Sequence, residues 1–147
     1  MPGQIDRELQ NTRPVASLEV EAALNIQRTG DFLERWTDTV LQPMELRGDQ
    51  YNILRILRGA GDGGHPTSEV RRRMIHETER FPALVHALRT RGLIAGTLHL
   101  TITNAGRELL ASIDGTLENA IRRRFGGIEP AKLRTVVEVL ERLRAGG

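Results

Sequence analysis

Residues 67–103 decide the fold, and they read TSEVRRRMIHETERFPALVHALRTRGLIAGTLHLTIT. A short helix is expected first, because Val70 and Met74 lie one helical turn apart. A second helix follows a polar turn and ends at Gly92, a typical helix-terminating residue. Its inner face has the i, i+3, i+4, i+7 spacing of an amphipathic helix and consists of Phe81, Leu84, Val85 and Leu88. The pattern predicts a helix-turn-helix, and we call its second helix the reading helix.

Two short apolar stretches after the reading helix predict a β-hairpin. They surround Gly96-Thr97, and glycine in the first position of a two-residue loop is typical of a type II′ turn. At the start of the reading helix, Thr78 is a candidate N-cap, whereas Pro82 favours a later start at Phe81. Two helices followed by a hairpin form a winged helix-turn-helix, which places its second helix in the major groove of DNA.

The segments on either side predict further helices. Residues 1–14 are polar and are expected to form a mobile arm. Ser17 and Thr103 are good N-caps, and Pro130 suits the first position of a helix. The helices are expected at residues 18–41, 48–57 and 104–125, and from 130 onward. The predicted order is α–α–α–α–β–β–α–α, a mainly α fold.

The outer helices also predict a domain organisation. The helix at 18–41 is long for a small domain, so its apolar stripe must pack against something large, often a partner subunit. The last helix has an apolar face made of Leu133, Val136, Val137, Leu140 and Leu143. We therefore expect residues 15–45 and 104–147 to form a helical dimerisation region around a winged helix-turn-helix at 46–103.

The charge is concentrated in the middle of the chain. The formal net charge is +2, but residues 51–107 contain nine arginines against four acidic residues, and the remainder is net acidic. A basic middle suits nucleic-acid binding, although an ordinary solvated surface explains the same charge. The chain has no cysteine and no apolar run of the roughly 20 residues that cross a membrane. Its N-terminus lacks the apolar core of a signal peptide, so we expect a cytoplasmic protein.

Four segments resemble the MarR (multiple antibiotic resistance regulator) family of small dimeric bacterial transcription factors. They are LRGDQYNILRIL (46–57), TSEVRRRMI (67–75), LVHALRTRGLI (84–94) and LTITNAGRELL (100–110). The resemblance implies a homodimer that binds a palindromic operator in double-stranded DNA. It also implies control by a small aromatic or phenolic ligand.

The resemblance places the DNA contacts on the short helix, the reading helix and the hairpin. The candidate residues are Ser68, Arg71, Arg72, Thr78, Arg80, Ala83, His86, Thr97 and His99. Relatives typically have Thr-Arg where Pro82-Ala83 stand, and an Asp-x-Arg element in a longer hairpin loop. The alternative function is therefore a dimer of this shape with weak or lost DNA binding, which acts as a ligand-binding or protein-interaction module.

Other kinds of site have little support. Phe32, Trp36 and Tyr51 are candidates for a ligand pocket between the dimerisation helices and the winged module, although core packing explains the same spacing. The four histidines lack the spacing of metal ligands, and no catalytic triad, phosphate-binding loop or nucleotide fingerprint is visible. We expect neither a metal nor a cofactor, and no enzyme activity.

Overall fold

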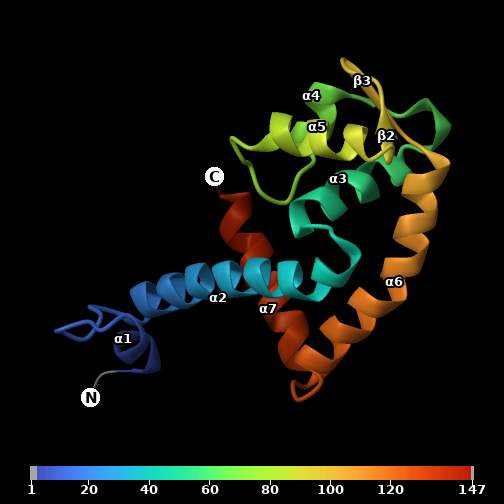
Figure 1. Cartoon of the computed structure of the whole chain (residues 1–147). Coiled ribbons are helices and arrows are strands. Elements are labelled where there is room, and N and C mark those ends of the chain that lie inside the picture. Colours follow the sequence, from blue (N-terminus) through green and yellow to red (C-terminus); the bar gives the residue numbers. More distant parts are fainter. Residues whose placement is uncertain (1–2, 147) are drawn as a thin grey trace.

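The computed structural model describes residues 3–146, which fold into helices and a small antiparallel sheet (Figure 1). The predicted order of the major elements is confirmed, and α1, η1, η2 and β1 are additions that the sequence did not predict. In chain order the elements are α1 (Gln4–Glu8), α2 (Leu18–Leu41), η1 (Gln42–Met44), α3 (Gly48–Gly59), η2 (Gly61–Gly63), β1 (His65–Pro66), α4 (Thr67–Arg72), α5 (Phe81–Thr90), β2 (Ile94–Ala95), β3 (His99–Ile102), α6 (Asn104–Phe125) and α7 (Pro130–Ala145).

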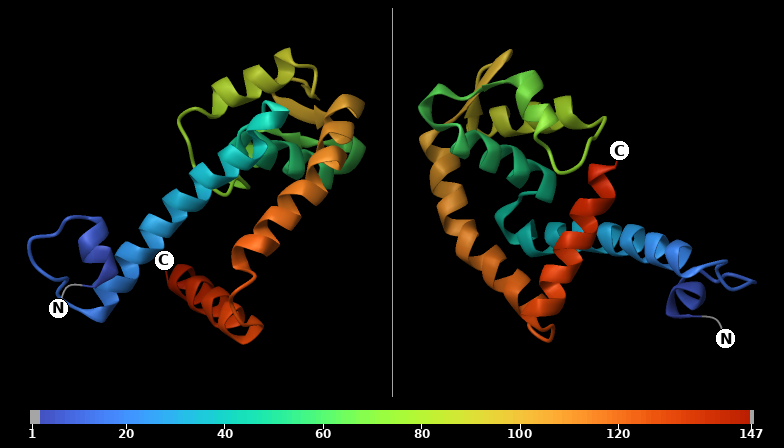
Figure 2. Two further views of the ribbon diagram at one scale, coloured as in Figure 1. Left: turned by 60° about the horizontal axis from the view of Figure 1, so that its bottom comes forward. Right: turned by 180° about the vertical axis from the view of Figure 1, so that it is seen from behind.

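The core lies where α3, α4, α5 and the sheet meet the first half of α6. The predicted inner residues of the reading helix, which is α5, are all buried there. They pack with side chains of α3, the sheet and α6, including Leu54, Leu57, Leu100, Leu110 and Ile113. Outside this core, α2 extends away and α6 and α7 form a V (Figure 2).

The hairpin exists, but its predicted turn is wrong. A two-residue turn at Gly96-Thr97 would pair Ala95 with Leu98, whereas Ala95 pairs with Thr101. The connection is therefore longer, and Leu98 lies at its tip, 87% exposed. Gly96 has φ +99°, and a Cβ there would lie 1.9 Å from the carbonyl oxygen of His99, so only glycine fits. Strand β3 also pairs with β1, which gives the sheet order β1-β3-β2.

Threonines lie at the starts of both α4 and α5. Thr67 is the first residue of α4, and its hydroxyl donates to the Thr97 carbonyl at the hairpin tip. Thr78 Oγ1 accepts from the N–H of Arg80 at 3.1 Å, but α5 begins at Phe81, as Pro82 suggested. The start of α6 is confirmed: Thr103 Oγ1 accepts from the N–H of Gly106. A Cβ on Gly106 would lie 2.3 Å from the Leu93 carbonyl oxygen, which explains the glycine there.

The predicted mobile arm at 1–14 is not without structure. It contains α1, whose Ile5 is 2% exposed, while the buried Asp6 accepts hydrogen bonds from the Gly3 N–H and the Asn11 amide. Helix α1 lies against the first half of α2 (Figure 1), where Glu8 comes within 3.9 Å of Arg28. Residues 1 and 2 of the arm lie outside the described residues.

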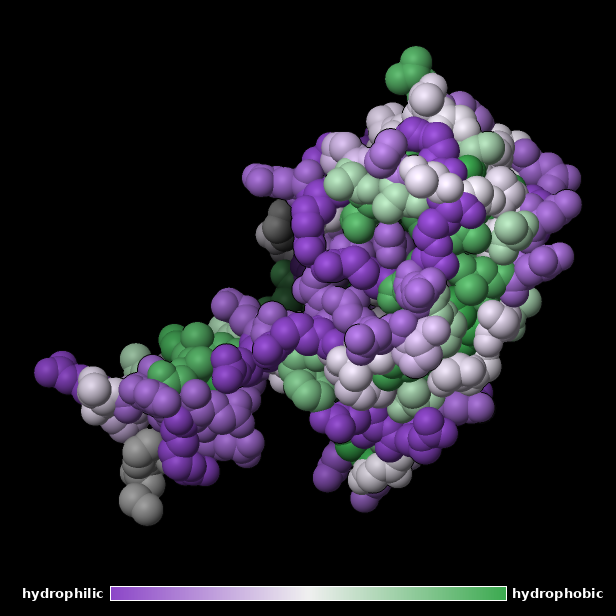
Figure 3. Space-filling model, viewed as in Figure 1, coloured by the Kyte–Doolittle hydropathy of each residue, from purple (hydrophilic) through white to green (hydrophobic). Residues whose placement is uncertain are grey.

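The outer helices expose much of their apolar surface. Helix α7 contains no buried residue, and on its predicted apolar face Val136, Val137 and Leu143 are exposed to solvent. Apolar side chains are also exposed at the far end of α2, where they show as a green patch in Figure 3. Within residues 3–146, no helix is both long and apolar enough to cross a membrane.

Candidate functional site

A groove of about 360 Å³ lies between the two helices of the helix-turn-helix and the hairpin tip. Three of the predicted DNA contacts, Ser68, Arg71 and Thr97, lie together in its wall. We call it the cation groove, and it is lined by Thr67, Ser68, Arg71, Phe81, Pro82, Val85, Arg89 and Thr97.

Two arginines supply the positive charge of the cation groove. Arg71 lies over the Phe81 ring, 5.6 Å from its centroid, and forms no ion pair with another described residue. Arg89 is half-buried, and its Nε has no hydrogen-bond partner among residues 3–146. This buried Nε is out of reach of DNA, so a phosphate oxygen would be bound by Arg71 and by the terminal nitrogens of Arg89. Arg89 was not among the predicted contacts, although its place one turn after the inner residue Val85 indicates that it borders the core.

The other arginines of α4 are already paired. Arg72 and Arg73 both form ion pairs with Glu69, and Arg73 Nε lies 2.8 Å from Glu69 Oε1. The hydrogen bond from Arg73 is the largest cause of a lowered pKa at Glu69. Arg72 remains highly exposed, so phosphate contact would require it to leave or share Glu69.

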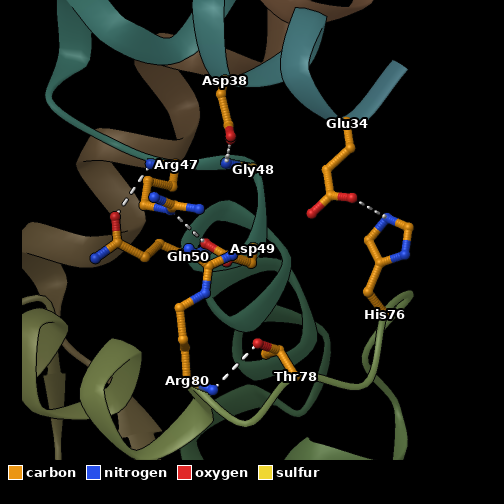
Figure 4. Close-up of polar contacts among 9 residues, drawn as sticks. All are labelled: Glu34, Asp38, Arg47, Gly48, Asp49, Gln50, His76, Thr78 and Arg80. Carbon is orange, nitrogen blue, oxygen red and sulfur yellow. Dashed lines mark hydrogen bonds and ion pairs between the residues drawn. The ribbon is translucent and has the colours of Figure 1, made fainter. Parts of the chain in front are cut away.

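The DNA contacts predicted on the reading helix differ in their environment: Arg80 is ion-paired, whereas Ala83 and His86 are exposed. Arg80, at the N-cap of α5, lies 3.8 Å from Asp49 on α3, as Figure 4 shows from the side of α3. Ala83 and His86 are exposed on the same helix. Alanine offers no side-chain hydrogen bond to a base edge, so His86 is the main polar group on this face.

The two predicted DNA contacts on the hairpin, Thr97 and His99, form hydrogen bonds that involve backbone carbonyl oxygens. Thr97 accepts a hydrogen bond from Thr67 through its carbonyl, and the Thr67 N–H donates to the Leu98 carbonyl at 2.9 Å. His99 Nε2 lies 2.5 Å from the Gly63 carbonyl oxygen in η2. These contacts fix the tip against α4 and η2, and they leave the His99 ring engaged.

A second hollow, of about 210 Å³, lies between α2, the start of α3 and the segment that joins α4 to α5. Most of its wall is apolar, with Glu34, Asp49 and His76 as its ionisable groups. We call it the α2–α3 pocket, and it is lined by Leu33, Glu34, Thr37, Gly48, Asp49, Asn52, Met74, Ile75 and His76.

The three aromatic residues proposed for ligand binding do not line a common pocket. Phe32 is covered on one face by Arg124, whose guanidinium carbon lies 4.6 Å from the ring centroid. Trp36 lines a shallow groove with Val40 and the end of α6. Tyr51 belongs to a separate hollow between α3 and α6, which it lines with Arg55, Arg58 and Asp114. Residues 3–146 also contain no group of three metal-ligating side chains.

Tyr51 takes part in a polar network that joins α3 to α6. Its hydroxyl donates to Asp114 at 2.8 Å, and Arg58 donates to both oxygens of the same carboxylate, at 2.6 and 3.3 Å. The Arg58 hydrogen bond holds the pKa of Asp114 below its ordinary value. Burial, followed by the hydrogen bond to Asp114, raises the pKa of Tyr51 to about 12.

The chain was compared with protein-family models, with curated protein sequences and with solved structures, and only the solved structures match it. No protein-family model matches the chain, and no curated protein matches its sequence. Among solved structures, a MarR-family regulator from Streptomyces coelicolor is 27% identical, with a TM-score of 0.76 over 88% of this chain and 96% of that one.

Two other solved regulators were crystallised with ligands. A MarR-family protein from Mycobacterium tuberculosis, solved with DNA, is 23% identical over 88% of this chain and 98% of its own, with a TM-score of 0.65. The same protein was also solved with salicylic acid. The protein CouR from Rhodococcus jostii RHA1, solved bound to p-coumaroyl-CoA, is 22% identical over 88% of this chain and 95% of its own, with a TM-score of 0.75. The chain therefore has the winged helix-turn-helix fold of the MarR family, whose members are DNA-binding transcriptional regulators and not enzymes.

Proposed function

We propose that the chain is a homodimeric transcriptional regulator that binds a palindromic site in double-stranded DNA. The observation that carries this proposal is the cation groove, where Arg71 and Arg89 line a hollow formed by both helices of the motif and the hairpin tip. Phosphate contacts from arginines position a protein on the duplex and supply much of its affinity. The likeness to a regulator solved with DNA supports the same assignment.

The exposed surface supports a dimer. The chain exposes 10276 Å², whereas a compact monomer of 16.4 kDa exposes about 7,500 Å². The difference is roughly 2,800 Å² per chain, or about 5,600 Å² for two chains, which lies at the upper end of obligate dimer interfaces. We propose that residues 15–45 and 104–147 form this interface around the module at 46–103. Exposed apolar residues in these regions include Leu18, Val20, Ile26, Phe32, Ile121, Ile128, Val136, Val137, Val139 and Leu143.

We place the effector site in the α2–α3 pocket instead of among Phe32, Trp36 and Tyr51. This pocket joins a proposed dimerisation helix, α2, to the segment that carries the start of the reading helix. A ligand there would contact both parts and therefore bias their relative position. Regulators of the same fold were solved with salicylic acid and with p-coumaroyl-CoA, which supports control by a small molecule.

A second function is favoured by the ion pairs of the winged module. Arg72 and Arg73 share Glu69, and Arg80 is paired with Asp49, so three of its cations are partly neutralised before DNA approaches. On this alternative the dimer binds DNA weakly and serves as a ligand-binding or protein-interaction module.

Footprinting on the duplex DNA around the chain's own gene separates the two functions. The regulator predicts a protected palindrome and an affinity that falls steeply with salt. An R71A/R89A double variant should lose at least about tenfold in affinity, since each lost phosphate contact removes about 0.9 from the salt slope. Arg13→Ala, an exposed position outside the module, is the matched control. Absence of protection even at low salt would leave the alternative in place.

A further inference from the structure

The volume and the mostly apolar lining of the α2–α3 pocket suit a ligand with one small aromatic ring. Leu33 and Thr37 contribute from α2, and Met74 and Ile75 contribute from the segment after α4. An apolar cavity of about 150 Å³ holds benzene, so about 210 Å³ accommodates a single ring with a short substituent.

The ionisable groups of the pocket are mostly acidic. Glu34 and Asp49 line it, and no lysine or arginine does so within the described part of the chain. His76 Nε2 lies 3.9 Å from Glu34 Oε2, and the two side chains point toward each other in Figure 4. Two arginines approach Asp49 from outside the pocket, Arg47 at 3.4 Å and Arg80 at 3.8 Å. Both arginines offset the charge of Asp49 from outside the pocket, so the described wall itself holds no arginine or lysine that could pair with an anion.

The remaining polar groups of the pocket offer an anion only neutral donors. The Asn52 side-chain oxygen accepts from the Ile75 N–H at 2.8 Å, which leaves the Asn52 amide NH2 group and the Thr37 hydroxyl as donors in the wall. The Gly48 N–H donates to Asp38 at 2.7 Å and is therefore engaged. A carboxylate placed here would meet the Glu34 carboxylate, and Asp49 with its charge offset by two arginines, and would exchange its water for neutral donors, which is costly. A cation would gain Glu34, whose side chain is partly exposed and has His76 as its one ionic neighbour in the described chain.

We propose that the α2–α3 pocket takes a small aromatic amine or amidine, a ring with a positive charge, and disfavours aromatic carboxylates. The inference rests on the proposed function, in which this pocket is the effector site, and it names the chemical class of the effector. The chain would thereby differ from the structural relative that was solved with salicylic acid. Glu34 and Asp49 would set the preference, and the apolar wall would hold the ring.

Three ligands that share one aromatic ring but differ in charge, from positive through neutral to negative, test this preference. Benzamidine, benzamide and benzoate are added to the full-length protein labelled with ¹³C at the methionine methyl groups. Met74 lines the pocket, while Met44 packs against the core elsewhere, so the Met74 signal should move and the Met44 signal should not. We expect benzamidine to bind at least about tenfold more tightly than benzoate, with benzamide between them.

Two variants assign the preference to the carboxylates. Glu34→Gln and Asp49→Asn should each reduce the benzamidine-to-benzoate ratio about threefold or more, because each removes one charge. Glu118→Gln, an exposed carboxylate on α6, is the matched control and should leave the ratio unchanged. Thermal unfolding of each variant shows that it is folded, and benzamide binding reports on the apolar wall.

The outcomes separate the inference from the function on which it rests. Tighter binding of benzoate, with a shift at Met74, would overturn the charge preference and leave the effector site standing. Equal binding of all three ligands would overturn the preference as well. If no ligand moves Met74 at millimolar concentration, both the ligand class and the effector site are wrong, while DNA binding is judged separately by footprinting.

Discussion

Arg80 Nη2 lies 3.8 Å from Asp49 Oδ2, so the cation at the start of the reading helix is paired with a carboxylate of α3. The Asp49 side chain is only 9% exposed, whereas Arg80 is 56% exposed. Asp49 also lines the α2–α3 pocket. The same carboxylate therefore lies beside the proposed effector and restrains an arginine that the resemblance assigns to DNA. This pair is the most direct physical link between the two proposed sites.

Removing the charge of Asp49 should strengthen DNA binding. Asp49→Asn frees Arg80 to contact a phosphate, and we expect affinity to rise up to about fivefold, the scale of an exposed ion pair. The slope of log affinity against log salt should steepen by about 0.9. Fluorescence anisotropy with a duplex at several salt concentrations measures both quantities. The Glu118→Gln variant makes the same charge change on α6 and should have neither effect; an unchanged slope in Asp49→Asn would show that Arg80 does not reach DNA.

Restoring hydrogen-bonding residues on the reading helix should also increase affinity. The P82T/A83R double variant adds an arginine at an exposed position, and one bidentate contact to guanine is worth about 1–3 kcal/mol. We expect at least about fivefold tighter binding at a site with guanine in the matching position. P82T/A83Q is the control that adds no charge. Equal affinities of P82T/A83R and the wild type would mean that this helix is not where affinity is lost.

The Tyr51–Asp114–Arg58 network should make stability depend on pH. The pKa of Asp114 is lowered by the Arg58 hydrogen bond, so its contribution is present above the ordinary aspartate value near 4 and is lost as pH falls through the folded value. The pKa of Tyr51 is raised to about 12, so its contribution is lost as pH rises from about 10 to 12.

Replacing Asp114 tests the network directly. Asp114→Asn should lower the free energy of unfolding by about 1–2 kcal/mol at pH 7, a discounted value because both partners are partly exposed. It should also remove the loss of stability below about pH 4 that this residue causes. Urea unfolding between pH 3 and pH 7 provides the measurement. A variant whose stability falls as steeply in acid as the wild type would contradict this account.

A charge on the apolar face of α7 should weaken the dimer. Val137 is 52% exposed, and in a dimer interface a buried aspartate would lack a partner. Val137→Asp should therefore move the mass measured by analytical ultracentrifugation toward that of a monomer. Ala131→Asp, at an exposed position away from the apolar face of the same helix, is the control. If both variants keep the mass of the wild type, α7 does not form the interface through this face.

The sequence was sufficient for the longer helices and for their inner faces, because those depend on local periodicity. Phe81, Leu84, Val85 and Leu88 are all buried as predicted. The hairpin turn was wrong because its register depends on pairing of β3 with both β2 and β1, which lies outside the hairpin. The short helix α1 was missed because it is stabilised by contact with α2.

The site was less predictable than the fold, because its chemistry depends on contacts between distant segments. Ser68, Arg71 and Thr97 were placed together, but Arg89 was missed. The Asp49–Arg80 pair joins residues 31 positions apart in sequence, and no local pattern indicates it. The three aromatic candidates were grouped by their spacing and residue type, which do not determine which pocket a side chain faces.

Selection of bound sequences from random duplex DNA tests the central claim, DNA binding through the cation groove by a symmetric dimer, most directly. The protein is incubated with a random library, and the enriched duplexes are then titrated with wild type, R71A/R89A and the Arg13→Ala control. We expect an inverted repeat with half-sites centred about 10 base pairs apart or a multiple of that, bound at least about tenfold more weakly by R71A/R89A. Failure to enrich any sequence, or equal binding by wild type and R71A/R89A, would contradict the account.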